Sequence, residues 1–283
     1  MAFCLRIADC VARVRGDGVP LSPGPDHAPF LCEEVASPDL DWRCAALERS
    51  HPSGRRCFAA EGVLEASRLP GGDFLLKIPC GPRLRCETIL TPDAAHGRFA
   101  LAPWPEDAQL TTLPRGFELA CQSLLARRGS FLVHAAGLSL GGVGVLLPAS
   151  SGGGKSTLAG RCGPLEVLSD ERVAVSTRNG PRIHGTPWRG TAGRVRADSA
   201  PLGAILFLGP HGPPHGLRPL GRAEAFRRLY FHSFPPLWDR TGVAEVLAAA
   251  EEIASRVPSG ELRLPPTAGP EAVRAALHEL GAA

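Results

Sequence analysis

The sequence predicts an α/β fold with a small β-rich N-terminal domain followed by a phosphate-binding-loop domain. The second domain is expected to contain a mixed sheet and a hairpin that leads directly into the phosphate-binding loop. Three observations predict it. Residues 149–157 fit the phosphate-loop pattern Ala/Gly-x-x-x-x-Gly-Lys-Ser/Thr, and residues 131–148 form two apolar runs around a glycine pair. Residues 1–112 alternate short apolar runs with Pro, Gly and Asp. We therefore expect one domain over residues 1–112 and a second over residues 113–283.

The N-terminal domain is expected to consist of short strands and turns. Phe74–Ile78 is an apolar run, and the turn-forming Pro70–Asp73 and Cys80–Pro82 flank it. No chemical motif stands out there, so the domain is a candidate for binding a substrate or a partner. The proline-rich segment Pro103–Pro114 is the predicted boundary.

A helix and a hairpin are predicted next. Residues 117–128 place apolar side chains on one helical face. Residues 131–140 and 143–148 flank Gly141-Gly142, a pair suited to a two-residue hairpin turn. That turn pairs residues whose numbers sum to 283, which puts His134 opposite Ala149 at the mouth of the phosphate loop. A histidine on an apolar strand is otherwise an ordinary core residue.

The glycine-rich stretch is the predicted nucleotide site. Successive glycines let backbone N–H groups turn toward phosphate oxygens. Lys155 is expected to reach the β- and γ-phosphates, and the Ser156 hydroxyl is expected to bind Mg²⁺. The alternative is a flexible Gly/Ser loop. The residues expected to hold the nucleotide are Ser151, Gly152, Gly153, Gly154, Lys155, Ser156 and Thr157.

Two acidic residues follow the loop and its helix. In the segment 165–175 an apolar strand is predicted to end in Asp170 and Glu171, whose oxygens suit Mg²⁺ and an attacking hydroxyl. Thr186–Gly190 is either a simple bend or a pocket wall in which Arg189 touches phosphate or acceptor. The rest of the chain is predicted as a buried strand, an edge strand and three helices, at residues 204–208, 261–264, 221–231, 238–257 and 270–280.

Composition excludes several classes of protein. The net charge of +3 is mild and the arginines are scattered, so no nucleic-acid partner is expected. Nine cysteines without a C-x-x-C pair, and no leader-like start, predict reduced thiols and a cytoplasmic protein. The uncharged stretch 131–149 contains glycines and His134, so it is predicted as a hairpin rather than a membrane span. His211 and His215 are expected to be exposed rather than metal ligands.

Absent residues narrow the choice among phosphate-loop proteins. Asn179 is the only asparagine in the sequence, and Gly180 follows it. The sequence therefore lacks the Asn-Lys-x-Asp motif with which GTPases recognise guanine. Both glutamines, Gln109 and Gln122, precede the loop. This excludes the phosphate-loop proteins in which a glutamine downstream of the loop positions the attacking water.

The remaining pattern resembles a known family. His134-Ala-Ala-Gly, the glycine-turn hairpin, the loop 149–156 and Leu168-Ser-Asp-Glu171 resemble the kinase domain of HPr kinase/phosphorylase and its relatives. More distantly they are similar to the ATP site of phosphoenolpyruvate carboxykinase. The resemblance covers about residues 115–210. It implies that Lys155 and Ser156 serve nucleotide and Mg²⁺ and that His134 lines the transfer site. It further implies that Asp170 is the base for a serine hydroxyl and that Glu171 stands near the metal.

The leading expectation is an ATP- and Mg²⁺-dependent kinase of a serine-type hydroxyl in a peptide, protein or small molecule. Its expected catalytic residues are Asp170, His134, Lys155, Glu171 and Arg189, and its expected metal ligands are Ser156, Glu171 and Asp170. One alternative is a nucleotide-binding regulatory or peptide-docking protein with little transferase activity. A second is a carboxykinase-like enzyme. No membrane partner is expected, and a homo-oligomer stays open.

Overall fold

The computed structural model describes residues 2–79, 85–106, 108–110, 114–150, 152–209 and 215–282. The chain forms two compact units, Met1–Arg128 with Pro235–Ala244, and Gly129–Phe234 with Glu245–Ala283. The predicted boundary between residues 112 and 113 lies outside the described residues. Helix α1 (Pro114–Ala126), which that boundary assigned to the second domain, belongs to the first unit.

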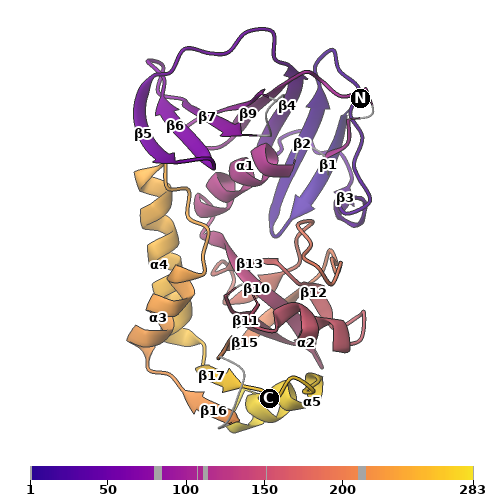
Figure 1. Ribbon diagram of the computed structural model, residues 1–283, viewed down its shortest axis with the longest axis vertical. Coiled ribbons are helices and arrows are strands. Elements are labelled where there is room, and N and C mark those ends of the chain that lie inside the picture. Colours follow the sequence, from indigo (N-terminus) through magenta and orange to yellow (C-terminus); the bar gives the residue numbers. More distant parts are fainter. Residues whose placement is uncertain are drawn as a thin grey trace. The chain divides into compact units, whose positions relative to one another are not determined.

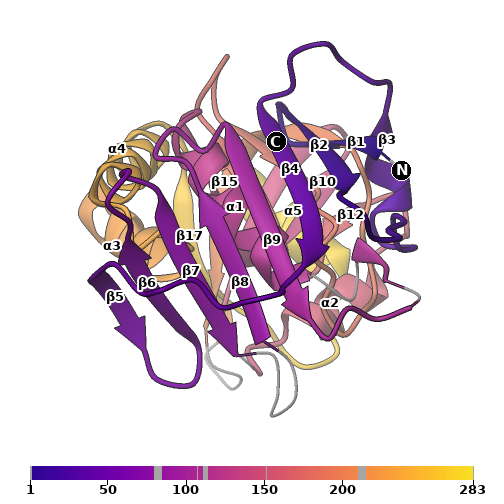
Figure 2. The ribbon, with the colours of Figure 1, turned by 90° about the horizontal axis from the view of Figure 1, so that it is seen from above.

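The first unit is built on one mixed sheet, as the β-rich pattern of its sequence predicts. Its nine strands within the described residues run in the order β3-β1-β2-β4-β9-β8-β7-β6-β5 (Figure 2). Trp42 is buried in its core, and its ring centroid lies 6.4 Å from that of Phe99 and 6.0 Å from that of Phe117 of α1. The strands are β1 (Ala2–Ile7), β2 (Cys10–Gly16), β3 (Leu31–Cys32), β4 (Leu40–Ala46), β5 (Arg55–Ala60), β6 (Leu64–Arg68), β7 (Phe74–Pro79), β8 (Arg85–Leu90) and β9 (His96–Ala102), and a short 3-10 helix spans Ala28–Phe30.

The second unit also has a mixed sheet, so the α/β class with mixed sheets is confirmed. Among the described residues its order is β11-β10-β13-β14-β15-β17-β16, with β12 paired to β10 and β11 also paired to β15. The pairs β11–β15 and β15–β17 are parallel. The strands are β10 (Ser130–Leu140), β11 (Val143–Pro148), β12 (Val167–Ser169), β13 (Arg172–Ser176), β14 (Arg182–His184), β15 (Ser199–Leu208), β16 (Gly216–Pro219) and β17 (Ser259–Arg263).

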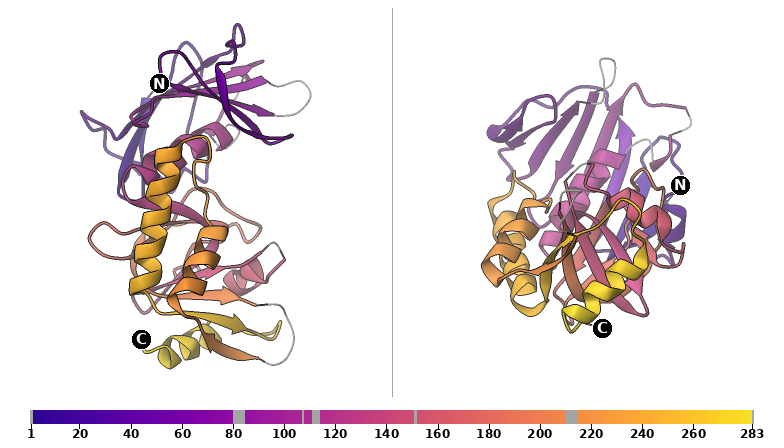
Figure 3. Two further views of the ribbon diagram at one scale, coloured as in Figure 1. Left: turned by 90° about the vertical axis from the view of Figure 1, so that its left-hand side faces the viewer. Right: turned by 60° about the horizontal axis from the view of Figure 1, so that its bottom comes forward.

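Helices cover both faces of this sheet. Leu206 of β15 packs in one core with Leu158 of α2 (Lys155–Arg161) and Val273 of α5 (Pro270–Glu279). The next residue, Phe207, points to the opposite face because side chains alternate along a strand. Its ring meets His232, which follows α3 (Arg222–Phe231). Helix α4 (Arg240–Arg256) runs beside α3 (Figure 1, Figure 3) and is joined to it by the Arg222–Glu251 ion pair. Helices α1, α3, α4 and α5 therefore lie close to their predicted ranges.

The hairpin register is confirmed. Leu140 pairs with Val143 and Ala135 with Pro148, so partner numbers sum to 283 throughout. Gly141 and Gly142 have φ values of 63° and 86°, the left-handed conformations that a type I′ turn requires. Strand β10 continues beyond the hairpin toward its N-terminal end, where His134 pairs with Arg172 of β13. One long strand thus brings His134 next to both β13 and the start of the glycine loop.

Of the strands after the glycine loop, one ends where it was predicted to end, one lies elsewhere in the sheet than predicted, and one was not predicted. The apolar strand predicted to end in Asp170–Glu171 is confirmed, because β12 ends at Ser169 and the chain bends at these two residues before β13. The segment 261–264 was predicted as an edge strand, but β17 lies between β15 and β16. Strand β16 forms that edge. It contains a glycine and a proline, which are uncommon within strands, so the sequence did not predict a strand there.

The thiols are mostly as predicted. The cysteines that form no disulfide, among the described residues, are Cys4, Cys10, Cys32, Cys44, Cys57, Cys121 and Cys162. Cys86 is disulfide-bonded, so the expectation that every cysteine is reduced is wrong at this position. Within the described ranges, no helix has both the length and the apolar character needed to cross a bilayer.

Candidate nucleotide and phosphoryl-transfer site

The glycine loop connects β11 to α2 and has a backbone that only glycines adopt easily. Gly152 and Gly154 have φ values of 78° and 86°. At Gly153 an added Cβ would lie 2.8 Å from the Cβ of Ala149, which is too close for a real contact. Each glycine is therefore required by conformation or by space. Ser151 lies outside the described residues.

Lys155 begins α2 and points its amine into the loop. The side chain is 5% exposed, and its Nζ donates hydrogen bonds to the carbonyl oxygens of Ala149 (2.7 Å) and Ser150 (3.2 Å). Burial lowers the pKa of Lys155, and the negative charge of Glu171 opposes this shift. Ser156 and Thr157 follow on the first turn, half-buried and exposed respectively. The loop thus holds a fixed positive charge beside two hydroxyls.

His134 of β10 contacts Glu171, the residue that precedes β13. Nε2 of His134 lies 3.4 Å from Oε1 of Glu171, and the backbone N–H of Ala135 donates to the Glu171 carbonyl (3.2 Å). Burial is the largest cause that lowers the pKa of His134. The positive charge of Lys155 lowers it further, and Glu171 opposes both. The charges of His134, Glu171 and Lys155 therefore act on one another, and the structure brings these three predicted residues into one cluster.

Three further residues complete this cluster and were not predicted. Arg172 lies 3.6 Å from Glu171, with its guanidinium 5.0 Å from the ring centroid of Phe234. His232 accepts the backbone N–H of His134 at its carbonyl (2.8 Å). Burial, followed by His134 and Lys155, lowers the pKa of His232 to about 4. Its place next to Glu171 in the sequence could have indicated Arg172. No local pattern marks residues 232 and 234, which join the site through tertiary packing.

Asp170 faces away from this cluster. It is fully buried, and its carboxylate accepts backbone N–H groups from Gly190 (2.8 Å), Ala192 (2.6 Å) and Arg194 (3.3 Å). An added Cβ at Gly190 would lie 2.9 Å from Oδ2 of Asp170. Because its oxygens are committed to the 190–194 loop, Asp170 is poorly placed to act as the base or a metal ligand. This geometry argues against the roles expected for it and favours a structural one.

The loop that Asp170 holds carries Arg189. Its neighbour Trp188 is 5% exposed, so the tryptophan is a core residue rather than a wall of an open pocket. Arg189 is exposed on the same loop, one residue before the first N–H bound by Asp170. The structure therefore fixes the backbone beside Arg189, and Arg189 itself is exposed.

The oxygen ligands near the loop suit Mg²⁺. Among the residues that the structure describes, no group of three His, Cys, Asp or Glu side chains forms a metal site by itself. Mg²⁺ at phosphate-transfer sites usually takes only one or two protein oxygens, with phosphates and water completing its coordination. The Ser156 hydroxyl and the Glu171 carboxylate are ligands of that type.

No protein-family model matches the chain, and no curated protein matches its sequence significantly.

Proposed function

We propose that this chain is an ATP- and Mg²⁺-dependent kinase, related to HPr kinase/phosphorylase, that phosphorylates a serine-type hydroxyl of a peptide, protein or small molecule. The observation that carries the proposal is the cluster of Lys155, His134 and Glu171 at the mouth of a phosphate-loop motif. Phosphoryl transfer to a hydroxyl needs a positive charge at the phosphates and a group, such as a carboxylate, that accepts the hydroxyl proton. The imidazole of His134 lies 3.4 Å from the carboxylate of Glu171.

Each residue has a distinct role in this proposal. Lys155 and the loop N–H groups neutralise the phosphate charge, and Ser156 binds Mg²⁺. Glu171, oriented by His134, accepts the proton of the acceptor hydroxyl while the oxygen attacks the γ-phosphorus and ADP leaves. This role belongs to Glu171 instead of Asp170, because Glu171 lies 3.4 Å from His134 and its charge acts on Lys155. The Asp170 carboxylate instead accepts three backbone N–H groups.

Transfer of labelled phosphate tests the function. The protein is incubated with Mg²⁺, γ-labelled ATP and serine-containing peptides, and label is measured in the peptide and in free phosphate. We expect label in the peptide, and none with Lys155→Ala because the phosphates lose their fixed cation. Slow release of free phosphate alone would favour the nucleotide-binding regulatory protein, and decarboxylation of a small acid coupled to nucleotide use would favour the carboxykinase-like enzyme.

A further inference from the structure

Folding aligns three arginines that are far apart in the sequence. Strands β2, β4 and β9 are parallel neighbours in the first unit, and their register pairs Arg15 with Arg43 and Arg43 with Arg98. Adjacent strands lie about 5 Å apart, so the three residues form one row across the sheet. No local pattern indicates this row, because the three residues belong to separate segments. The arginines that look scattered in the sequence are therefore partly gathered in the fold.

The row lies on the face of the sheet opposite to α1, which is the face toward the viewer in Figure 2. Trp42 and Phe99, the sequence neighbours of Arg43 and Arg98, point to the other face, where Trp42 packs against Phe99 and against α1. Because side chains alternate along a strand, Arg43 and Arg98 point away from that core. Both are exposed, and the Arg15 side chain is 36% exposed.

The charges around the row are unbalanced. The Asp41 carboxylate accepts hydrogen bonds from two arginines of β2, Arg15 (3.0 Å) and Arg13 (3.1 Å). Within the described ranges, no acidic side chain forms an ion pair with Arg43 or Arg98. Four arginines therefore share one carboxylate. Like charges that face each other on neighbouring strands destabilise a sheet, so an anion bound to the row would relieve this repulsion.

We propose that the arginine row, Arg15, Arg43 and Arg98, is a docking surface for an acidic segment of a polypeptide. Each guanidinium presents a planar fork of N–H donors that matches a carboxylate. Alternate side chains of an extended peptide lie about 7 Å apart, so a Glu-x-Glu segment can direct two carboxylates onto the row. This inference goes beyond the proposed kinase function and does not depend on it.

An acidic peptide fits this face better than a nucleic acid does. Proteins that bind single-stranded nucleic acid combine positive charge with aromatic side chains on which the bases stack. In the described part of the first unit, the exposed large apolar side chains are Leu31, Val63 and Leu237, and none is aromatic. The row therefore offers partners for anionic groups without a stacking platform for bases.

Peptide binding to the full-length protein tests the assignment. Fluorescence anisotropy measures the Kd of labelled Ser-Glu-Ser-Glu-Ser-Glu and of the same peptide with Gln in place of Glu, at about 0.1 M salt, where distant charges are screened. We expect the acidic peptide to bind about tenfold more tightly. Arg43→Gln and Arg98→Gln should each raise its Kd about tenfold, the effect of losing one charged hydrogen-bonding partner.

Arg55→Gln is the matched control. Arg55 is exposed on β5, at the far end of the same sheet, so this variant loses the same charge outside the row and should change the Kd less than about twofold. Urea denaturation shows that the variants fold. Because Arg43→Gln removes repulsion within the row, it should leave the free energy of unfolding unchanged or raise it while binding is lost.

Four outcomes would overturn the assignment. Equal binding of the two peptides would show that the carboxylates are not recognised, and an equal loss in Arg55→Gln would show that only net charge matters. Tighter binding of a ten-residue oligothymidylate than of the acidic peptide, lost in the same variants, would assign the row to nucleic acid. Failure of the wild type to bind any of these ligands would leave the row without a docking role. None of these measurements uses ATP, so the proposed kinase activity stands or falls separately.

Discussion

Asp170 and Glu171 are adjacent carboxylates with opposite environments. The Asp170 carboxylate is buried and accepts three backbone N–H groups, whereas the Glu171 side chain is 30% exposed and lies 3.4 Å from His134. A carboxylate surrounded by N–H donors stabilises a loop, and one that is accessible beside an imidazole is available to a substrate. We therefore expect a structural role for Asp170 and a role in the reaction for Glu171, although both side chains are carboxylates.

Conservative amide substitutions separate these two roles. Glu171→Gln removes the proton acceptor and should lower phosphoryl transfer by roughly 10²–10⁴ while nucleotide binding and thermal stability stay unchanged. Asp170→Asn replaces one accepting oxygen by an NH₂ group that faces N–H donors, and should lower the free energy of unfolding by about 1–3 kcal/mol. Transfer rate, nucleotide Kd and chemical denaturation are measured for both.

A reversed pattern contradicts the assignment. Unchanged stability in Asp170→Asn together with a large loss of transfer would return the role of base to Asp170. Glu171→Asp is the control for Glu171, since it keeps the carboxylate and should retain part of the transfer rate that Glu171→Gln loses.

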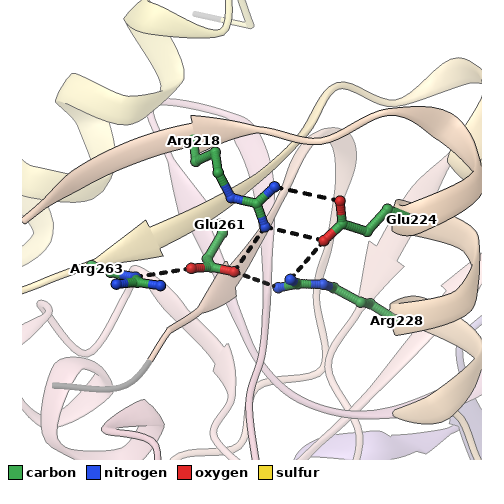
Figure 4. A network of polar contacts seen from close by, with 5 residues as sticks. All are labelled: Arg218, Glu224, Arg228, Glu261 and Arg263. Carbon is green, nitrogen blue, oxygen red and sulfur yellow. Dashed lines mark hydrogen bonds and ion pairs between the residues drawn. The ribbon is translucent and has the colours of Figure 1, made fainter.

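At the scale of elements, an ion-pair network joins α3 and β16 to β17 (Figure 4). Glu261 of β17 lies 3.1 Å from Arg218, 2.8 Å from Arg228 and 2.9 Å from Arg263. Arg218 and Arg228 also bind Glu224, at 3.1 Å and 2.7 Å. Burial raises the pKa of Glu261, but the hydrogen bonds from its three arginines outweigh this effect and lower the pKa to about 2.

Removing the central charge of this network should loosen α3. Glu261→Gln leaves three arginines without their shared anion and should lower the free energy of unfolding by about 1–2 kcal/mol, as expected for hydrogen bonds to a charged group that retain some access to water. Glu251→Gln breaks the exposed Arg222–Glu251 pair and should cost less than about 0.5 kcal/mol. Urea denaturation compares the two variants, and equal losses would show that the network adds nothing beyond a surface pair.

The hairpin turn offers a stabilising substitution. Gly141 has φ 63°, and a Cβ added there meets nothing within 4 Å. Asparagine tolerates this conformation and restricts the unfolded chain, so Gly141→Asn should raise the free energy of unfolding by about 0.4–1 kcal/mol. Gly142→Val places a β-branched residue at φ 86° and should lower it. Thermal denaturation measures both, and stabilisation by Gly142→Val would contradict the type I′ turn.

Local patterns in the sequence predicted the elements but not how they orient side chains. The hairpin register follows from a two-residue glycine turn, and the helix at residues 240–256 follows from its apolar periodicity. The direction of Asp170 does not, because the N–H groups that hold it come from a loop some twenty residues further along the chain. The interior place of β17 likewise depends on its pairing with β15 and β16, which is set by packing between distant segments.

At the scale of the whole molecule, each unit contains a histidine that favours its neutral form. His27 in the first unit is 1% exposed, and burial lowers its pKa to about 4. His232 in the second unit has its pKa lowered to about 4, mainly by burial. Among the described residues, neither ring nitrogen of His27 has a hydrogen-bond partner. Both histidines therefore resist protonation in the folded chain and accept a proton once unfolded.

Both units should consequently lose stability in mild acid. As pH falls from about 6.5 to about 4, the unfolded chain binds protons at these histidines and the folded chain does not, so the free energy of unfolding decreases with falling pH. The lowered pKa of His134 adds to this trend, whereas Glu261, with a pKa of about 2, loses its contribution only at lower pH. Hydrogen exchange of each unit across this range measures the decrease.

His27→Leu should flatten the pH dependence of the free energy of unfolding in the first unit, and His232→Gln should reduce it in the second. A decrease that persists unchanged in His27→Leu would assign the acid sensitivity of the first unit to other groups, because leucine has no proton to gain.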